Sequence, residues 1–375
     1  MSSKKIPLFD LSRQHSALKK DFEQIFSKLL DRSAFTYGRE TEDFQDLFAK
    51  MHDSRFALGI RSGTASLWVA LKSLGLTSKD EVITTPATFS ATADAIILAG
   101  AKPVFADVDA NTGNLDPESV KKQVTKHTKA ILVVHLYGVP ADMTALKKIA
   151  KENNLFLLED ASHAHGSELN GKKVGSFGHF GCFSLYPSKS LGSLGNAGVL
   201  TSNSAKLIKK AEQYAHHGIK DKSKKYLHSL VGMNELIDNI QAAFLLKKLE
   251  FFPKWIKKRR QIVEEYNYVF RKFGHQGMFY YPASKPNFYV FSVQMKNRKK
   301  FEKFMNERQI ATGIYYPTPV HLQPSMKFLG YKKGDFPIAE KFAQQTISLP
   351  LFPELKETEI KRIKTAIREY FIGEN

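Results

Sequence analysis

The sequence has a single cysteine, Cys182, and no long apolar run. One cysteine cannot form a disulfide within the chain or a cysteine-based metal cluster, so we predict a reducing compartment and no metal site. A membrane-spanning helix needs about 18 consecutive apolar residues. The N-terminal stretch contains lysines, proline and aspartate in place of the apolar core of a signal peptide. We therefore expect a cytoplasmic protein with no membrane span.

Acidic residues are in short supply, with 37 Asp and Glu against 56 Lys and Arg, so the formal net charge is +19. The basic residues are spread along helical stretches such as 207–217 and 254–266, a pattern typical of a solvated surface. We predict no nucleic-acid partner. A non-catalytic or nucleic-acid-binding protein is the alternative that charge alone suggests, and its binding would fall steeply with salt.

Between residues 56 and 200, short β-branched or apolar runs alternate with stretches of helical periodicity. The predicted strands are 81–85, 102–108, 130–138, 155–160 and 198–202, and the predicted helices are 64–76, 91–101 and 142–154. This alternation is typical of helices packed on a largely parallel sheet. Ligands of such sheets bind beyond the carboxyl ends of the strands, so the loops there are the place to look for a site.

A long amphipathic stretch follows at 234–273, interrupted by Pro253. Because proline kinks or ends a helix, we place a domain boundary there, with a large domain at 1–252 and a small one at 253–375. The small domain is predicted to contain a strand at 287–295 and helices at 297–310 and 357–371.

The stretch Ser62–Thr64 stands just before a predicted helix. Its glycine lets a ligand approach the backbone, and the free N–H groups of the helix start favour an anion such as a phosphate. Taken alone, the same stretch also fits an ordinary helix cap.

An apolar strand delivers Asp160 to its carboxyl end, and His163 follows in "EDASHAHG". A buried carboxylate is costly unless a cation or hydrogen-bond donors compensate it, and a protonated ring nitrogen would do so. The alternative is an aspartate that caps a helix.

Lys189 lies in the small-residue turn "YPSKSLGS", close to Ser184. A lysine in a dry pocket loses part of its ammonium character, which an amine needs in order to condense with an aldehyde. An anion cradle, a strand-end aspartate and a loop lysine together meet the needs of pyridoxal phosphate.

Several motifs, including "SGTASL", "EDASHAHGS", "SLYPSKSLGSLGNAG" and "GMNELIDNIQAAFL", resemble the DegT/DnrJ/EryC1/StrS nucleotide-sugar aminotransferases, and the likeness runs from about residue 6 to 370. The resemblance implies the aspartate aminotransferase-like α/β fold (fold type I), with a large, mixed, mostly parallel sheet domain and a small α+β C-terminal domain. It also implies pyridoxal 5'-phosphate, L-glutamate as amino donor, and a homodimer that shares its active sites.

The resemblance assigns roles residue by residue. Lys189 is the Schiff-base lysine and Asp160 is the partner of the pyridine nitrogen. The remaining cofactor contacts are Gly63, Thr64, Phe89, His163 and Ser184, with Asn234 supplied by the neighbouring subunit. The candidate sugar contacts are Tyr186, Tyr315 and His321.

The sequence also departs from the family pattern. Ala65 stands where an acid is usual, the "GDGG" turn is "GNAG", and "NSR" is replaced by Asn234, Glu235 and Leu236. The stretch "NFYVF" has neither of the usual histidines. These changes concern the sugar and nucleotide contacts more than the cofactor.

We therefore expect a transaminase that aminates a UDP- or dTDP-linked keto sugar for a surface polysaccharide or lipopolysaccharide. The motifs at 135–143 and 315–323 favour a 3-keto sugar. A 4-keto sugar is the alternative, and a dehydratase relative is disfavoured because such proteins replace the lysine with histidine.

Overall fold

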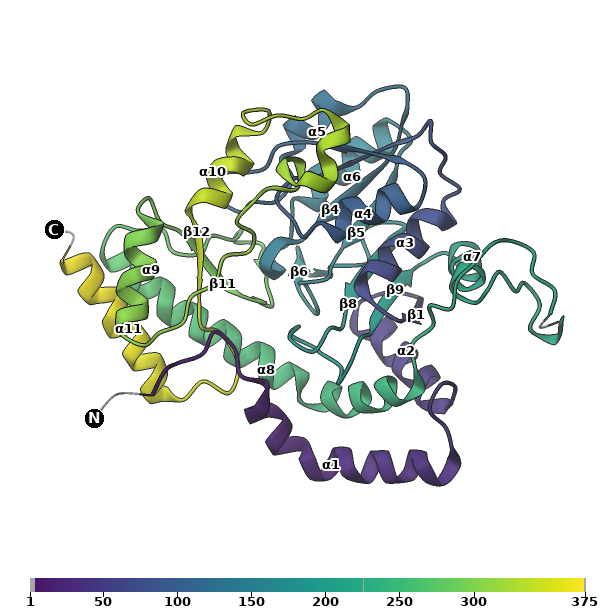
Figure 1. Ribbon diagram of the computed structural model, residues 1–375, viewed down its shortest axis with the longest axis horizontal. Coiled ribbons are helices and arrows are strands. Elements are labelled where there is room, and N and C mark those ends of the chain that lie inside the picture. The colour runs from purple at the N-terminus through teal and green to yellow at the C-terminus, as the bar shows by residue number, and fades with distance from the viewer. Residues whose placement is uncertain (1–3, 225, 374–375) are drawn as a thin grey trace.

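Seven strands form one large sheet in the computed structural model, which describes residues 4–224 and 226–373 (Figure 1). The strand order is β1-β9-β8-β5-β4-β2-β3; β9 runs antiparallel to both of its neighbours, and the other pairs are parallel. The strands are β1 (Phe56–Ile60), β2 (Glu81–Thr84), β3 (Lys102–Phe105), β4 (Thr128–Val134), β5 (Phe156–Asp160), β8 (Phe180–Ser184) and β9 (Gly198–Ser202). The predicted α/β fold class, a mixed and mostly parallel sheet, is confirmed.

Helices cover both faces of this sheet because its central strands are apolar on both sides. Along β4, Leu132 packs in the cluster that contains α3, while Ile131 and Val133 pack in the opposite cluster with α6. Alternate residues of a strand point to opposite faces, so one apolar run serves two cores. The helices around the sheet are α3 (Gly63–Ser73), α4 (Ala91–Leu98), α5 (Pro117–Gln123), α6 (Met143–Glu152) and α7 (Ala205–Ala215).

One long helix, α8 (Asn239–Lys272), runs beneath the sheet and continues to the C-terminal part of the chain (Figure 1). Of the two outcomes expected at Pro253, a kink or an end of the helix, the end does not occur, because α8 continues to Lys272. Proline removes one backbone hydrogen bond, while the neighbouring Phe252, Trp255 and Ile256 are buried in a cluster with α1 (Leu11–Arg32) and α2 (Arg39–Met51). This tertiary packing outweighs the local cost.

The C-terminal part has a core drawn mainly from α8 from residue 262 onward and from the elements that follow, with Ile6, Leu136, Tyr137 and Val139 added from earlier in the chain. Its elements are α9 (Arg298–Glu307), α10 (Pro337–Gln345), α11 (Glu357–Ile372) and the strand pair β11 (Phe291–Gln294) and β12 (Thr346–Leu349). A small sheet joins β10 (Ser284–Lys285), β6 (Glu168–Leu169) and β7 (Lys172–Lys173). Short 3₁₀ turns lie at Leu136–Gly138, Lys222–Lys224, Val320–Leu322 and Pro324–Leu329.

We propose that two domains, 1–252 and 253–375, meet along α8. Three of the clusters around the large sheet support this division, since they draw on residues up to 256, while the C-terminal cluster draws mainly on residues from 262 onward. A fifth cluster joins the two parts, because side chains between 320 and 339 pack with Phe105 of β3 and Ala93 of α4.

The N-terminal segment packs against the C-terminal core. Ile6 is buried there and bridges Ile310, with hydrogen bonds from Ile6 N to Gln309 O (2.8 Å) and from Ala311 N to Ile6 O (3.0 Å). Further along, Arg13 binds Glu359 of α11 through both terminal nitrogens at 2.7 Å. The two ends of the described chain are therefore joined.

The five strands predicted between 81 and 202 are present as β2, β3, β4, β5 and β9. The predicted helices correspond to α3, α4, α6, α9 and α11. The sequence analysis did not identify α1, α2, α10, β1 or β12. Over the residues that the structure covers, no helix combines the length and apolarity that a bilayer crossing requires.

Candidate active site

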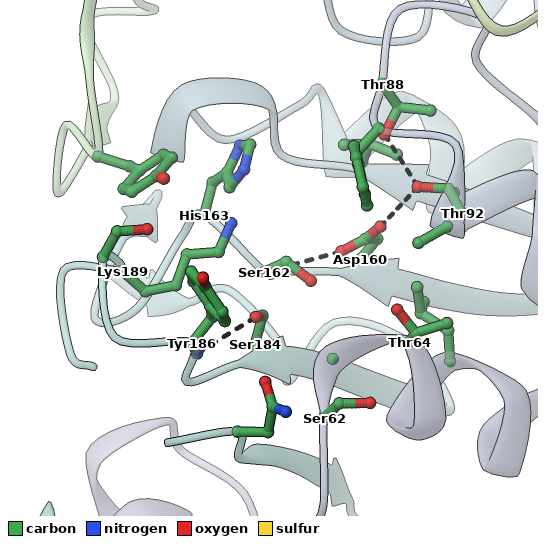
Figure 2. A pocket seen from close by; sticks show the side chains of 18 of the residues that line it. Ser62, Thr64, Thr88, Thr92, Asp160, Ser162, His163, Ser184, Tyr186 and Lys189 are labelled. Atoms are coloured by element: carbon green, nitrogen blue, oxygen red, sulfur yellow. Dashed lines mark hydrogen bonds between the residues drawn. The ribbon is translucent and has the colours of Figure 1, made fainter. Parts of the chain in front are cut away.

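A cavity of about 370 Å³ opens at the carboxyl ends of β4, β5 and β8, where the start of α3 also lies (Figure 2). Its lining is Ser62, Gly63, Thr64, Leu67, Thr88, Phe89, Ala91, Thr92, Val134, Asp160, Ser162, His163, Ser184, Tyr186, Ser188, Lys189, Asn196, Ala197, Tyr289 and Tyr316. Among these residues Lys189 carries the one ammonium and Asp160 the one carboxylate.

The first turn of α3 forms one end of the cavity. Ser62 caps the helix, since its Oγ accepts from Ala65 N at 3.0 Å, and the first intrahelical bond runs from Ser66 N to Ser62 O. The N–H groups of Gly63 and Thr64 precede that bond. A Cβ built on Gly63 would lie 2.6 Å from the Cβ of Ser184, so only glycine allows this close approach. Free N–H groups at a helix start beside two hydroxyls suit a phosphate.

Asp160 lies at the end of β5 and is 5% exposed. Its Oδ2 accepts from the Thr92 hydroxyl (2.8 Å), which is itself hydrogen-bonded to Thr88 (2.9 Å), and its Oδ1 accepts from Ser162 N (3.1 Å). These donors hold the carboxylate in one orientation toward the cavity (Figure 2).

Glu159 supports the same strand end from the opposite face. It is fully buried and accepts from the backbone N–H groups of Gly175, Phe177 and Gly178 at 2.7 to 2.8 Å. His135 Nε2 lies 3.2 Å from its Oε2, and because His135 Nδ1 accepts from Ala141 N, the Nε2 carries the proton. With four donors, this buried carboxylate is satisfied without a cation.

Lys189 projects from the loop after β8 toward the cavity, with its amine below His163 (Figure 2). Burial lowers the pKa of the Lys189 amine to about 8, and the carboxylate of Asp160 opposes this shift. The loop itself is tight, since a Cβ at Gly192 would lie 2.2 Å from the carbonyl oxygen of Pro187. The small residues around Lys189 therefore let the loop fold back on itself.

His163 is 6% exposed and stacks on Tyr289, with ring centroids 4.5 Å apart. Burial, and then the charge of Lys189, holds its pKa well below the usual value. Its Nδ1 accepts from Tyr137 N at 3.3 Å, so the neutral ring carries its proton on Nε2.

The structure brings most of the predicted site residues together around the cavity but leaves three outside it: Asn234, Tyr315 and His321. Phe89 and Tyr186 line the cavity and are 57% and 54% exposed. Asn234 lies on an exposed segment that bridges His216, away from the cavity of its own chain.

Tyr315 and His321 are not brought to the cavity as the predicted sugar contacts. The neighbouring residue, Tyr316, lines the cavity in place of Tyr315. The ring of Tyr316 packs against that of Phe89, with ring centroids 5.6 Å apart. His321 is buried instead, with its Nε2 3.2 Å from Glu340 Oε1 and its ring against that of Phe336. Aromatic packing and the Glu340 carboxylate account for this position.

The cavity residues that were not predicted include Thr88, Thr92, Tyr289 and Tyr316. The threonines lie four positions apart within the "TPATFSAT" stretch at 85–92, a spacing that could have placed both on one side of a turn. Nothing in the sequence places Tyr289 beside Lys189.

The cavity suits pyridoxal phosphate. It offers an N–H and hydroxyl cradle for the phosphate at α3, a carboxylate for the ring nitrogen at Asp160, and an amine of lowered pKa for the aldehyde at Lys189.

A second buried lysine holds the Lys189 loop from below. Lys248 of α8 is fully buried, and its Nζ donates to Gly192 O at 2.7 Å and lies 3.3 Å from His15 Nε2. Burial lowers the pKa of Lys248 to about 8, against a weaker opposing effect of Glu354. Two residues further along the loop, Leu194 N donates to Gln241 Oε1 at 3.0 Å. Helix α8 therefore fixes the loop at two points.

Lys248 is expected to make stability depend on alkaline pH. The pKa of this lysine is about 8 in the folded protein and about 10.4 in the unfolded chain. Between these two pH values the unfolded chain therefore binds more protons than the folded protein does. The free energy of unfolding then rises with pH over this interval. Lys248→Met should remove this contribution, about 1.4 kcal/mol for each pH unit of that interval. Denaturant unfolding of the cofactor-free protein at pH 7, 8, 9 and 10 measures it.

Lys148→Met is the matched control, because Lys148 is 76% exposed on α6. If the free energy of unfolding of Lys248→Met rises with pH as steeply as that of the control, the pH dependence does not come from Lys248 and the prediction is wrong.

The chain matches the model of the DegT/DnrJ/EryC1/StrS aminotransferase family over residues 16–368. It is 37% identical to a pleiotropic regulatory protein of Geobacillus stearothermophilus, with 98% of both chains covered. It is 34% identical to a UDP-N-acetyl-3-dehydro-alpha-D-glucosamine 3-aminotransferase of Acidithiobacillus ferrooxidans, again with 98% of both chains covered.

Solved structures agree with these sequence matches. DesV of S. venezuelae, in complex with a ketimine intermediate, superposes with a TM-score of 0.94 at 32% identity, covering 98% of this chain and 99% of its own. NtdA from Bacillus subtilis, with bound cofactor PMP, superposes with a TM-score of 0.90 at 26% identity, covering 99% and 87%.

Proposed function

The chain belongs to the DegT/DnrJ/EryC1/StrS family of pyridoxal-phosphate-dependent nucleotide-sugar aminotransferases, and we propose that it transfers the amino group of L-glutamate to a nucleotide-linked 3-keto sugar. The observation that carries this proposal is the arrangement of Lys189, Asp160 and the start of α3 around one cavity. The product would be an amino sugar for a surface polysaccharide or lipopolysaccharide.

Each group of the chain has a separate task in the reaction. When bound, the cofactor supplies an aldehyde that forms an imine with amines and a ring that withdraws electrons. Gly63, Thr64 and Ser184 would hold its phosphate, and Asp160 would keep a proton on its ring nitrogen.

The proton transfer is assigned to Lys189. Its Nζ would take a proton from the α carbon of the donor and later return one, as a positioned general base and acid. A pKa near 8 suits this task, because a substantial fraction of the amine is unprotonated near neutral pH.

We propose a homodimer in which the segment 216–238 completes the neighbouring active site. This segment leaves the body of the molecule after α7 (Figure 1) and exposes large apolar side chains, among them Tyr226 (84%) and Val231 (92%). Asn234 is exposed on it, so it is free to reach the phosphate of a partner.

The choice of a 3-keto sugar rests on the motifs around residues 135–143 and 315–323 and on the 3-aminotransferase name of the Acidithiobacillus relative. Tyr186 is the proposed sugar contact from the large domain. We assign the second contact, predicted at Tyr315 or His321, to Tyr316, because this side chain lines the cavity.

One experiment tests reaction and regiochemistry together. The purified protein is converted to its pyridoxamine form with L-glutamate, freed of glutamate, and mixed with matched 3-keto or 4-keto UDP- and dTDP-sugars. The absorbance of the pyridoxal form should return with the 3-keto sugars only. Return with the 4-keto sugars only would overturn the regiochemistry, and no bleaching by glutamate would overturn the donor assignment.

A further inference from the structure

Tyr289 belongs to the C-terminal part of the chain and lies next to Lys189. It lies two residues before β11 and lines the cavity, with Lys189 Nζ 4.6 Å from its ring centroid. The same ring stacks on His163 at an interplanar angle of 27°. An ammonium within about 6 Å of an aromatic ring centroid is attracted to the face of that ring.

The backbone holds this ring in place. Tyr289 N donates to Tyr137 O at 2.9 Å, and the Tyr289 carbonyl accepts from Arg259 Nη1 at 3.2 Å. Arg259 Nη1 also lies 3.1 Å from Leu351 O. Arg259 is 6% exposed and forms no salt bridge among the described residues. Backbone carbonyl groups therefore bind its charged side chain, and these hydrogen bonds tie α8 to the segments that contain Tyr289 and Leu351.

The other groups that face Lys189 give its ammonium little support once the cofactor is bound. Asp160 would then be engaged by the ring nitrogen. His163 and His165 are neutral because burial holds their pKa values well below the usual range. Tyr186 and Tyr316 also line the cavity but bring no carboxylate, so the remaining attraction that the chain offers comes from the ring of Tyr289.

We propose that Tyr289 is a positioning residue whose ring holds the ammonium form of Lys189 whenever that amine is not bonded to the cofactor. This inference rests on the proposed function, in which Lys189 alternates between a bonded and a free state. The free amine must stay close to the donor carbon while it carries a proton. A ring fixed by His163 and by the Arg259 network provides a defined place for it.

The test measures the Lys189 amine in the cofactor-free protein. Competitive acetylation with acetic anhydride, followed by mass spectrometry of the Lys189 peptide from pH 6 to 10, gives the apparent pKa of this amine. Tyr289→Leu removes the aromatic face and should lower that pKa by about one unit, from about 8 to about 7, which makes labelling at pH 7 about fivefold faster. Tyr289→Phe keeps the face and should label like the unmodified protein.

Two results would overturn the inference. In one, the Leu and Phe variants shift the pKa equally, which would assign the effect to the hydroxyl; in the other, neither variant shifts it. Tyr289→Met replaces the Leu variant if that variant does not fold, and circular dichroism shows whether each variant is folded.

Borohydride reduction of the cofactor-loaded protein separately tests whether Lys189 bonds the cofactor. If trapping fails, the proposed function is wrong, whereas normal trapping with unchanged labelling contradicts the Tyr289 inference alone.

Discussion

Replacing Lys189 by methionine is expected to lower kcat by at least about 10³-fold. The substitution removes both the amine that bonds the cofactor and the base that moves the proton, while the methionine side chain keeps most of the volume. Cofactor affinity should fall less than kcat, because the α3 cradle and Asp160 are untouched. Steady-state rates and fluorescence titration with pyridoxal phosphate measure the two effects.

The methionine variant should also be at least as stable as the unmodified protein when both lack cofactor. Burial lowers the pKa of Lys189, which means that the fold disfavours its charge near neutral pH. Lys148→Met, at an exposed lysine, controls for the exchange itself. Turnover of Lys189→Met at the rate of this control would exclude Lys189 as the catalytic amine.

Replacing Asp160 by asparagine is expected to lower kcat by about 10² to 10³-fold. The amide can still accept from Ser162 N, so the loop geometry is kept, but it has no charge to hold a proton on the cofactor ring. The Asp160 carboxylate also raises the pKa of Lys189. Asp160→Asn should therefore lower that pKa further below 8, as acetylation of the Lys189 peptide would measure.

Thr92→Val is the matched control for this prediction. It removes the 2.8 Å hydrogen bond to Asp160 Oδ2 and leaves the charge in place. We expect a loss of about tenfold, the low end of the range of about 1.5 to 3 kcal/mol that one hydrogen bond to a charged group contributes, because Ser162 N still orients the carboxylate. Equal losses in the two variants would show that orientation, rather than charge, is what Asp160 supplies.

The large sheet could be predicted because its signals are local. Each of the strands β2, β4 and β5 is a short apolar run bounded by turn residues, and the chain order of such runs leads to a mostly parallel sheet. The same rule placed Asp160 at a strand end, and the small-residue turn around Lys189 marked a loop where a ligand could approach.

The rest of the site depends on contacts between distant segments. Thr92 reaches Asp160 across 68 positions, and Tyr289 reaches Lys189 across about 100. No local pattern encodes such pairs. His321 was misplaced for the same reason, because its partner Glu340 lies on α10, a helix that the sequence analysis did not identify. The helix does not end at Pro253 because local propensity yields to the packing of the neighbouring residues.

The contact between Ile6 and Ile310 also has a consequence for synthesis on the ribosome. The first strand-like residues of the chain find their partner only after about 300 further residues have been made, which takes roughly 15 to 60 s at 5 to 20 residues per second. Until then Ile6, which is 1% exposed in the finished protein, lacks its backbone partners at 309–311 and most of the apolar cluster that buries it. The nascent large domain must therefore fold with its N-terminal segment undocked, and docking of that segment completes the fold.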